Sequence, residues 1–312
     1  MSTFDPDALE CLAAIVEEGG FERAAQRLSI TQSAVSQRLR SLESQVGTVL
    51  IVRSRPLKAT SAGRLLLKHT KMLRLLRADL ERDIKELAPG SLGASGGGRE
   101  EERIAIAINA DSIATWALPA LTALAQQGLA LKIIADDQNF TQEWLREGQV
   151  LGCVTTLKQA LRGCKMVALG AMDYVAVATP AFAQARLACS SQGQPQLTAH
   201  NFRSVPFIAF NRKDDMQTEF VGKAFGLKRV MLNQLFVPSS EGQVRAVLAG
   251  WGISVVPRLL AEGLLQQGLL LNVAPACALP VQLYWHCWNL QSEVLDALTN
   301  AISDAAAHAL VT

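Results

Sequence analysis

The sequence predicts an α+β multidomain protein with an N-terminal winged helix-turn-helix, a long helix after it, and a C-terminal α/β domain. Three observations predict this fold: helix and turn signals over residues 1–60, a leucine repeat over residues 61–88, and strand-like segments alternating with helical ones over residues 103–312. The 312 residues are 49% hydrophobic and 19% charged, which suits folded domains and excludes disorder as the dominant state.

Basic residues gather in the N-terminal part of the chain. From Arg23 to Arg77 there are twelve basic residues and one acidic residue, Glu43, a net charge of +11, although the whole chain carries only +2. Solvated protein surfaces usually mix the two signs. This concentration of one sign favours a polyanion, above all double-stranded DNA, as the partner of this region.

Three helices are predicted in the N-terminal region. Asp5 is typical of a helix start, and Gly19 ends that first helix. A second, short helix follows, and Thr31 caps a third helix that ends near Gly47. A helix, a short turn and a second helix make up a DNA-reading motif, so residues 1–60 are assigned to DNA binding.

The third helix and the segment after it hold the candidate DNA contacts. Hydroxyl and amide side chains near a helix N-terminus suit base edges and phosphates in the major groove. Residues 49–60 are β-prone, with a proline turn and three cations, and are predicted to form a wing that reaches the phosphate backbone. The candidates are Thr31, Gln32, Ser33, Ser36, Gln37, Arg38 and Arg40 on the helix, and Arg53, Arg55 and Lys58 on the wing.

A long helix is predicted over residues 61–88, with an apolar stripe along it. The small DNA-binding unit offers this helix little to pack on, so the stripe favours a homodimer that presents two recognition helices to a dyad-symmetric operator. Pairing of dimers into a dimer of dimers and contact with RNA polymerase are further partner hypotheses. The stripe comprises Leu66, Leu73, Leu80 and Leu87, widened by Leu76 and Ile84.

Residues 89–102 are rich in glycine and serine and are predicted to form a flexible hinge. The alternation of strands and helices after them indicates α/β units with parallel sheets. The uncharged stretch between Glu262 and Glu293 is interrupted by glycine and proline, so it predicts buried strands and no membrane helix. The N-terminus lacks a cationic and then apolar stretch, so no secretory signal is expected and the chain is expected to stay in the cytoplasm.

Several chemistries find no support in the sequence. The six cysteines form no CxxC pair and the four histidines no HxxxH pair, so no metal site, disulfide framework or cofactor is expected. A redox pair of Cys153 and Cys164 is the less favoured alternative to two reduced thiols. GxSxG, P-loop, GxGxxG and HExxH motifs are missing, so no enzymatic activity is predicted.

Residues 21–28, FERAAQRL, and residues 31–43, TQSAVSQRLRSLE, resemble the LysR-type transcriptional regulators. The similarity spans almost the whole chain and is greatest to the branch that controls export of lysine and arginine. The resemblance implies an effector domain of two subdomains shaped like periplasmic binding proteins, with the ligand in the cleft between them. These subdomains would comprise residues 103–168 with 273–312, and residues 169–272.

Ligands of such sheets gather at the carboxyl ends of strands and at helix N-termini. Asn109 and Ser112 are placed to receive an α-carboxylate, and Thr155 and Thr156 would add hydroxyl groups. A basic amino acid, lysine or arginine, also needs acidic partners. The acidic candidates are Asp111, Asp173, Asp214, Asp215 and Glu241, each of which is equally consistent with a structural role such as helix capping.

Two functions remain open at this point. The favoured one is a transcriptional regulator that responds to a basic amino acid and controls an amino-acid exporter gene. The alternative is an architectural or replication-origin-binding DNA protein with weak sequence specificity. The two differ in the ratio of specific to nonspecific DNA affinity.

Overall fold

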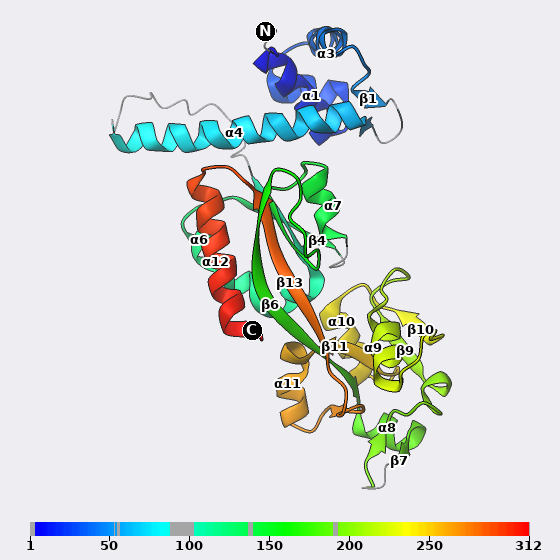
Figure 1. The fold of residues 1–312 in the computed structure, drawn as a ribbon. Coiled ribbons are helices and arrows are strands. Elements are labelled where there is room, and N and C mark those ends of the chain that lie inside the picture. The colour runs from blue at the N-terminus through cyan, green and yellow to red at the C-terminus, as the bar shows by residue number, and fades with distance from the viewer. Residues whose placement is uncertain are drawn as a thin grey trace. The chain divides into compact units, whose positions relative to one another are not determined.

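Figure 1 shows the computed structural model of the chain, which describes residues 4–52, 54, 57–87, 103–136, 140–189 and 193–311. Residue contacts divide the chain into two compact units. The first contains the described residues up to 87 together with Glu143–Leu151 and Leu290–Asp296, and the second contains the rest. The predicted hinge over residues 89–102 lies outside the described residues.

The N-terminal helices begin and end where the sequence predicts. They are α1 (Pro6–Glu18), α2 (Phe21–Leu28) and α3 (Gln32–Val46). The Asp5 side chain accepts a hydrogen bond from the backbone N–H of Asp7, the second residue of α1, and Thr31 Oγ1 accepts one from the backbone N–H of Ala34 at 3.2 Å. Gly19 and Gly47 end their helices in the left-handed conformation, which glycine adopts without steric cost.

A two-stranded wing follows α3. Strand β1 (Ile51–Val52) pairs antiparallel with β2 (Lys58–Ala59), which confirms the predicted ribbon. Glu43, the acid within the basic region, accepts a hydrogen bond from the backbone N–H of Leu50 at 2.8 Å and so ties α3 to the base of the wing. A side chain at Gly63 would collide with the carbonyl oxygen of Leu50, so glycine lets the next helix pack closely there.

Helix α4 (Ser61–Leu87) confirms the predicted long helix. Its apolar stripe is shifted by one residue at the start: Leu66 packs against the N-terminal core, whereas Leu65 is 71% exposed. Leu66 was selected because it lies seven residues before Leu73, but a repeat does not show which leucines the N-terminal core will cover. Leu65, one residue earlier, points about 100° away around the helix. Leu73, Leu76 and Leu80 are exposed as predicted.

The second unit is built on a mixed sheet. Its strand order is β11-β6-β13-β5-β3-β4, with β12 paired to β6, and β9 and β10 form a separate parallel pair. The strands are β3 (Ile104–Asn109), β4 (Leu131–Asp136), β5 (Gly152–Thr155), β6 (Cys164–Ala178), β7 (Ala188–Cys189), β8 (Pro195–Gln196), β9 (Pro206–Ala209), β10 (Asn233–Phe236), β11 (Ser254–Pro257), β12 (Leu271–Asn272) and β13 (Leu279–Trp288).

The prediction of parallel sheets is only partly right. Strand β3 pairs parallel with β4 and β5, but β6 pairs antiparallel with β11, β12 and β13. The long strands β6 and β13 pair along their length and run from the part of the unit that contains β3 to the part that contains β9 (Figure 1). The uncharged stretch near the C-terminus does form strands, β12 and β13. Strand β6 spans residues 168 and 169, so the subdomain boundaries stay a prediction.

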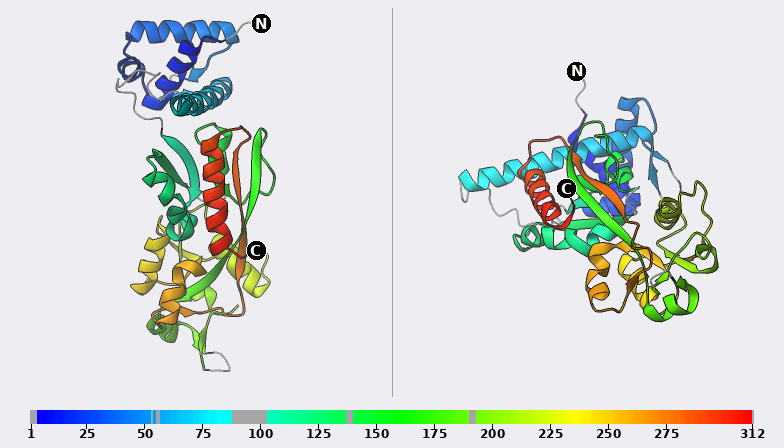
Figure 2. Two further views of the ribbon diagram at one scale, coloured as in Figure 1. Left: turned by 90° about the vertical axis from the view of Figure 1, so that its left-hand side faces the viewer. Right: turned by 60° about the horizontal axis from the view of Figure 1, so that its bottom comes forward.

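Helices cover the sheet. The last helix, α12, lies along β6 and β13 in the views of Figures 1 and 2, and the indole N–H of Trp285 donates to Thr299 of α12 at 3.1 Å. The helices of this part of the chain are α5 (Ala110–Ser112), the π-helical turn η1 (Ile113–Ala117), α6 (Leu118–Gln126), α7 (Thr141–Arg146), α8 (Pro180–Arg186), η2 (Phe202–Ser204), α9 (Met216–Phe225), α10 (Ser240–Leu248), α11 (Arg258–Gln266) and α12 (Glu293–Ala309).

The part of the chain that the structure describes contains no membrane-spanning helix, metal-ligand group or disulfide. No helix there is long and apolar enough to cross a membrane, and no group of His, Cys, Asp or Glu is arranged to hold a metal ion. All six cysteines are free. Burial raises the pKa of Cys153, which keeps this thiol protonated and unreactive at neutral pH.

His286 on β13 makes the stability of the fold depend on pH. Its side chain is fully buried, its Nε2 lies 2.8 Å from the carbonyl oxygen of Leu157, and burial lowers its pKa below 6.5. The unfolded chain therefore takes up a proton near pH 6.5 that the folded chain does not, so stability present above this pH is lost as pH falls. We expect a loss of up to about 1.4 kcal/mol for each pH unit below this value.

The measurement is the free energy of unfolding by denaturant near neutral pH and about two units lower. The variant His286→Gln keeps a donor for Leu157 and does not titrate, so its unfolding free energy should depend less on pH. An identical pH dependence in the two proteins would contradict this role of His286.

Candidate nucleic-acid interface and ligand cleft

The polar face of α3 lies opposite its core face. Val35, Leu39 and Leu42 are buried in the N-terminal core, whereas the predicted DNA contacts at the start of the helix are accessible. Thr31 and Ser33 are hydrogen-bonded to each other through their hydroxyl oxygens, 2.9 Å apart. The exposed residues of this face are Thr31, Gln32, Ser33, Gln37 and Arg40, with Ser36 partly exposed among them.

Cations of α3 and the wing differ in their surroundings. Arg38 is partly exposed and forms an ion pair with Asp7 of α1 at 3.0 Å, which holds its guanidinium against that helix. Lys58 is exposed on β2. Arg53 and Arg55 lie outside the described residues, so their role stays a prediction.

The acidic residues that precede the basic region form ion pairs within the N-terminal unit. Glu17 pairs with Arg27 of α2 at 2.6 Å and with Arg74 of α4 at 3.1 Å. Arg74 also donates from Nε to Glu10 at 2.9 Å. These ion pairs join α1 to α2 and α4, so the negative charge of α1 is largely neutralised inside the N-terminal unit.

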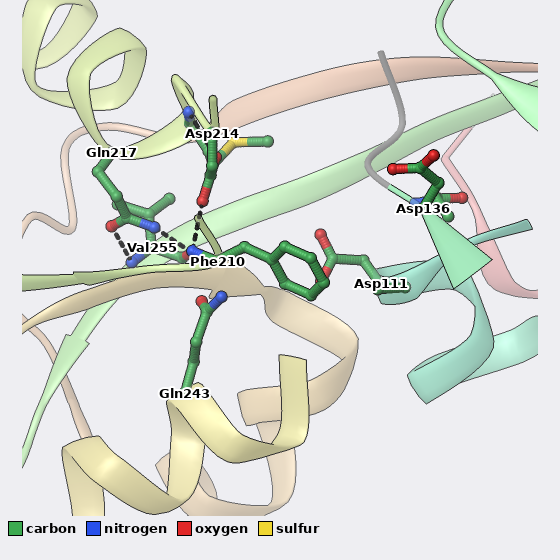
Figure 3. A pocket seen from close by; sticks show the side chains of 10 residues that line it. Asp111, Asp136, Phe210, Asp214, Gln217, Gln243 and Val255 are labelled. Atoms are coloured by element: carbon green, nitrogen blue, oxygen red, sulfur yellow. Dashed lines mark hydrogen bonds between the residues drawn. The ribbon is translucent and has the colours of Figure 1, made fainter. Parts of the chain in front are cut away.

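A small cleft that is partly open to solvent lies in the second unit (Figure 3). Asn109 and Asp136 end the neighbouring parallel strands β3 and β4, so the topology brings them to one edge of the sheet. The remaining lining residues come from α5, the segment after β9, helices α9 and α10, and β11. The lining is Asn109, Ala110, Asp111, Asp136, Phe210, Asp214, Met216, Gln217, Gln243 and Val255.

Among the described residues that line the cleft, three are aspartates and none is Lys, Arg or His. The two cations that precede Asp214 in its loop lie over aromatic rings: Arg212 over Phe236 at 5.9 Å, and Lys213 over Phe140 at 5.1 Å. Acidic lining without a basic lining residue makes the cleft attractive to a cationic ligand.

Burial raises the pKa of Asp111 above its usual value, and the charge of Asp214 raises it further. The hydroxyl groups of Ser240 and Tyr174 oppose this rise, and the Tyr174 hydroxyl donates to Asp111 Oδ2 at 2.6 Å. Burial likewise raises the pKa of Asp214, although the backbone N–H groups of Phe210 and Met216 donate to it at 2.8 and 2.9 Å. A cation between these carboxylates would stabilise their ionised forms.

Asn109 and Ser112 are also suited to a polar ligand. Asn109 is only 1% exposed, and neither atom of its side-chain amide has a hydrogen-bond partner among the described residues. The buried hydroxyl of Ser112 likewise has none there. An unsatisfied buried polar group costs about 1–3 kcal/mol, so a ligand that pairs with the Asn109 amide would recover part of this cost.

The structure brings Asn109, Asp111 and Asp214 of the predicted set together in the lining. Ser112 is buried in the first turn after β3, next to them in sequence but outside the lining. Thr155 donates its hydroxyl to the side chain of Gln142 at 2.8 Å. Thr155 and Thr156 at the end of β5 also lie outside the lining.

The other acidic candidates do not line the cleft. Side chains alternate between the two faces of a strand, so Asp173 and Tyr174 of β6 point to opposite faces, and Tyr174 is the one that reaches Asp111. Asp215 and Glu241 are exposed at the starts of α9 and α10, where acids are favourable for the helix dipole.

Several lining residues were not predicted from the sequence. Asp136 follows the apolar strand segment 131–135, so the rule that selected Asn109 would also have found it. No local sequence pattern indicated Gln217 and Gln243, because their roles depend on tertiary contacts. The side chain of Gln217 bonds both the N–H and the carbonyl of Val255, at 2.8 and 3.2 Å, and Gln243 accepts from Ser254 at 3.1 Å.

Both parts of the chain match known protein families. Residues 6–64 match the bacterial regulatory helix-turn-helix proteins of the lysR family, and residues 97–307 match the LysR substrate binding domain. The chain belongs to the LysR family of transcriptional regulators. This family consists of DNA-binding regulators and not of enzymes.

Similar proteins define the kind of regulator. The chain is 38% identical over 312 residues to the transcriptional regulator ArgP of Pseudomonas aeruginosa, covering 100% of this chain and 99% of ArgP. It is 39% identical to LysG of Mycobacterium tuberculosis, covering 97% and 93%. The crystal structure of ArgP from Mycobacterium tuberculosis covers 99% of both chains with 38% identity and a TM-score of 0.82.

A structure of full-length LysG from Corynebacterium glutamicum with bound effector Arg is also similar, with 34% identity and a TM-score of 0.73 over 99% of this chain and 100% of LysG. The protein is therefore a LysR-type DNA-binding regulator of the ArgP/LysG kind.

Substitutions on α3 and the wing should separate base reading from phosphate contact. We expect Lys58→Ala to weaken binding to all DNA sequences similarly and to reduce the slope of log affinity against log salt by about one. Gln32→Ala should instead cost about 1–3 kcal/mol on the cognate operator only, because it removes a base contact. Fluorescence anisotropy at several salt concentrations measures both effects.

Lys228, an exposed lysine of the second unit, provides the control substitution Lys228→Ala, which should change neither quantity. Sequence-selective loss in Lys58→Ala, or uniform loss in Gln32→Ala, would contradict the assignment of these roles.

Proposed function

We propose that this regulator binds a basic amino acid, arginine or lysine, in the cleft of its second unit and thereby controls transcription of an amino-acid exporter gene. The observation that carries the proposal is the lining, whose described residues include Asp111, Asp136 and Asp214 but no basic residue. A basic amino acid presents two cations to these carboxylates. Its α-carboxylate has the Asn109 amide and backbone N–H groups as possible partners.

The bound effector Arg in LysG from Corynebacterium glutamicum supports this assignment, because that chain resembles this one over its whole length. Within the cleft, Asp111 follows β3 and Asp214 precedes α9, so a ligand that contacts both joins two separate segments of the fold. A ligand of this kind favours the arrangement in which both contacts are made, which is the requirement for allosteric control.

The same proposal includes a homodimer formed through α4. Leu65, Leu73, Leu76 and Leu80 form an exposed stripe on this helix, with exposed fractions of 71%, 44%, 40% and 57%. Their spacing of three, four or eight residues places them on one side of the helix. A second copy of α4 would cover the stripe and pair two recognition helices for a two-fold operator.

We expect Leu80→Glu to weaken the dimer at least about tenfold, because dimerisation would bury an unpaired carboxylate. Ala78→Glu is the control: Ala78 is also exposed, but residues two apart on a helix face different directions. Sedimentation velocity over a range of protein concentrations measures the association. A monomeric wild-type protein, or an unaltered dimer in Leu80→Glu, would contradict this interface.

Effector binding should depend on Asp111. We expect Asp111→Asn to lower the affinity for arginine or lysine by about ten- to a hundredfold, the effect of losing one hydrogen bond between charged groups. The amide remains able to accept from Tyr174, so the fold should be preserved. Isothermal titration calorimetry with the full chain measures the affinity.

Asp304→Asn is the matched control, because Asp304 is exposed on α12 and lies outside the lining. Its affinity should equal that of the wild type. Equal affinities in all three proteins, or no binding of either amino acid to the wild type, would remove the assignment of the cleft.

Regulation itself is tested by transcription in vitro from the promoter of a neighbouring exporter gene. A regulator should bind that promoter far more tightly than competitor DNA, and arginine or lysine should change the transcript level. An architectural DNA protein would instead show a small ratio of specific to nonspecific affinity and no response to either amino acid.

A further inference from the structure

Tyr174 connects the cleft to the central sheet. It is 1% exposed on β6, where it pairs with Pro257 of β11 and with Leu279 of β13. Its hydroxyl donates to Asp111 Oδ2 at 2.6 Å. The donor is therefore fixed by strands on both of its sides, whereas Asp111 is partly exposed and lies at the start of the three-residue helix α5.

We propose that Tyr174 is a positioning residue for the effector: its hydroxyl orients the carboxylate of Asp111 toward the ligand cation and keeps that carboxylate ionised. This inference rests on the proposed binding of a basic amino acid in the cleft. It assigns a role to a side chain that is absent from the cleft lining.

The geometry supports the orienting role. A distance of 2.6 Å is within the range of about 2.5–2.7 Å that is typical of a hydroxyl bonded to a carboxylate. Because a carboxylate is planar, fixing Oδ2 restricts the direction of Oδ1. Figure 3 shows the Asp111 side chain reaching toward Phe210, on the side of the cleft that holds Asp214 and Gln243. A ligand cation then meets an acceptor that is already oriented, and less rotational freedom is lost on binding.

The hydroxyl also acts on the charge of Asp111. Burial and the negative charge of Asp214 both favour the protonated form, whereas a hydrogen bond to the carboxylate favours the ionised form. Without the Tyr174 hydroxyl, the pKa of Asp111 should rise further. The ligand cation would then compete with a proton for the Asp111 carboxylate up to a higher pH.

The test compares Tyr174→Phe with wild type by calorimetric titration of the full chain with arginine, from about pH 5.5 to about pH 9. We expect the pH at which affinity begins to fall on acidification to be higher in Tyr174→Phe. On the acidic side of that point, the affinity should be lower than wild type by about tenfold for each unit by which the pKa of Asp111 has moved. Above the titration, a smaller loss should remain from the lost orientation.

Tyr284→Phe is the matched control, because Tyr284 is the other tyrosine of the chain and is buried on β13 outside the cleft lining. Its pH profile should follow the wild type. Two results would overturn the proposal: a Tyr174→Phe profile equal to the wild type, or the same loss of affinity at every pH. A purely structural effect would give the same loss at every pH, because it leaves the pKa of Asp111 unchanged.

A readout without ligand separates this inference from the proposed function. The carboxyl carbon signal of Asp111 in protein labelled with carbon-13 at aspartate, assigned with Asp111→Asn, should titrate at a higher pH in Tyr174→Phe than in wild type. An unchanged midpoint would overturn the role of Tyr174 even where arginine binds. Absence of arginine binding to the wild type would refute the effector assignment instead.

Discussion

Asp111, Asp136 and Asp214 share one partly enclosed cleft, and this concentration of like charge determines how the second unit can work. Burial raises the pKa of Asp111 and of Asp214, and the charge of Asp214 raises that of Asp111 further, so their ionised forms are disfavoured. A cation relieves both effects, whereas an anion adds to them. The charge of the site is therefore what supports our proposal of a cationic ligand.

Basic and acidic residues are concentrated in different parts of this chain, although its net charge is only +2. In the N-terminal unit the acids of α1 bind Arg27, Arg38 and Arg74, while Lys58 and Arg40 remain exposed for a polyanion. In the second unit three aspartates, Asp111, Asp136 and Asp214, lie together in the lining of the cleft. One chain thus carries a basic surface suited to DNA and an acidic cleft, which we propose receives a small cation.

Local signals in the sequence predicted much of this structure. Caps such as Thr31 and Gly47 act within a few residues, and their helices begin and end as predicted. Polar residues after apolar strands placed Asn109 and Asp111 in the cleft, because parallel strands end at a common edge. Features that depend on distant residues were missed. Tyr174 lies 63 residues from Asp111 in sequence, and nothing local links the two.

Two predictions were wrong by a single residue, and each selected a side chain that points in a different direction from the correct one. On a strand, a step of one residue reverses the face, so Asp173 points away while Tyr174 reaches Asp111. On a helix, the same step exchanged exposed Leu65 for packed Leu66. The antiparallel pairing of β6 and β13 also escaped prediction, because strand direction is set by connections and not by composition.

A crystal structure of the full chain grown with arginine would test the central claim most directly. We expect a cationic group of arginine to lie within about 2.7–3.2 Å of carboxylate oxygens of both Asp111 and Asp214. Arginine bound at another place, or bound in the cleft without contacting either carboxylate, would contradict this account.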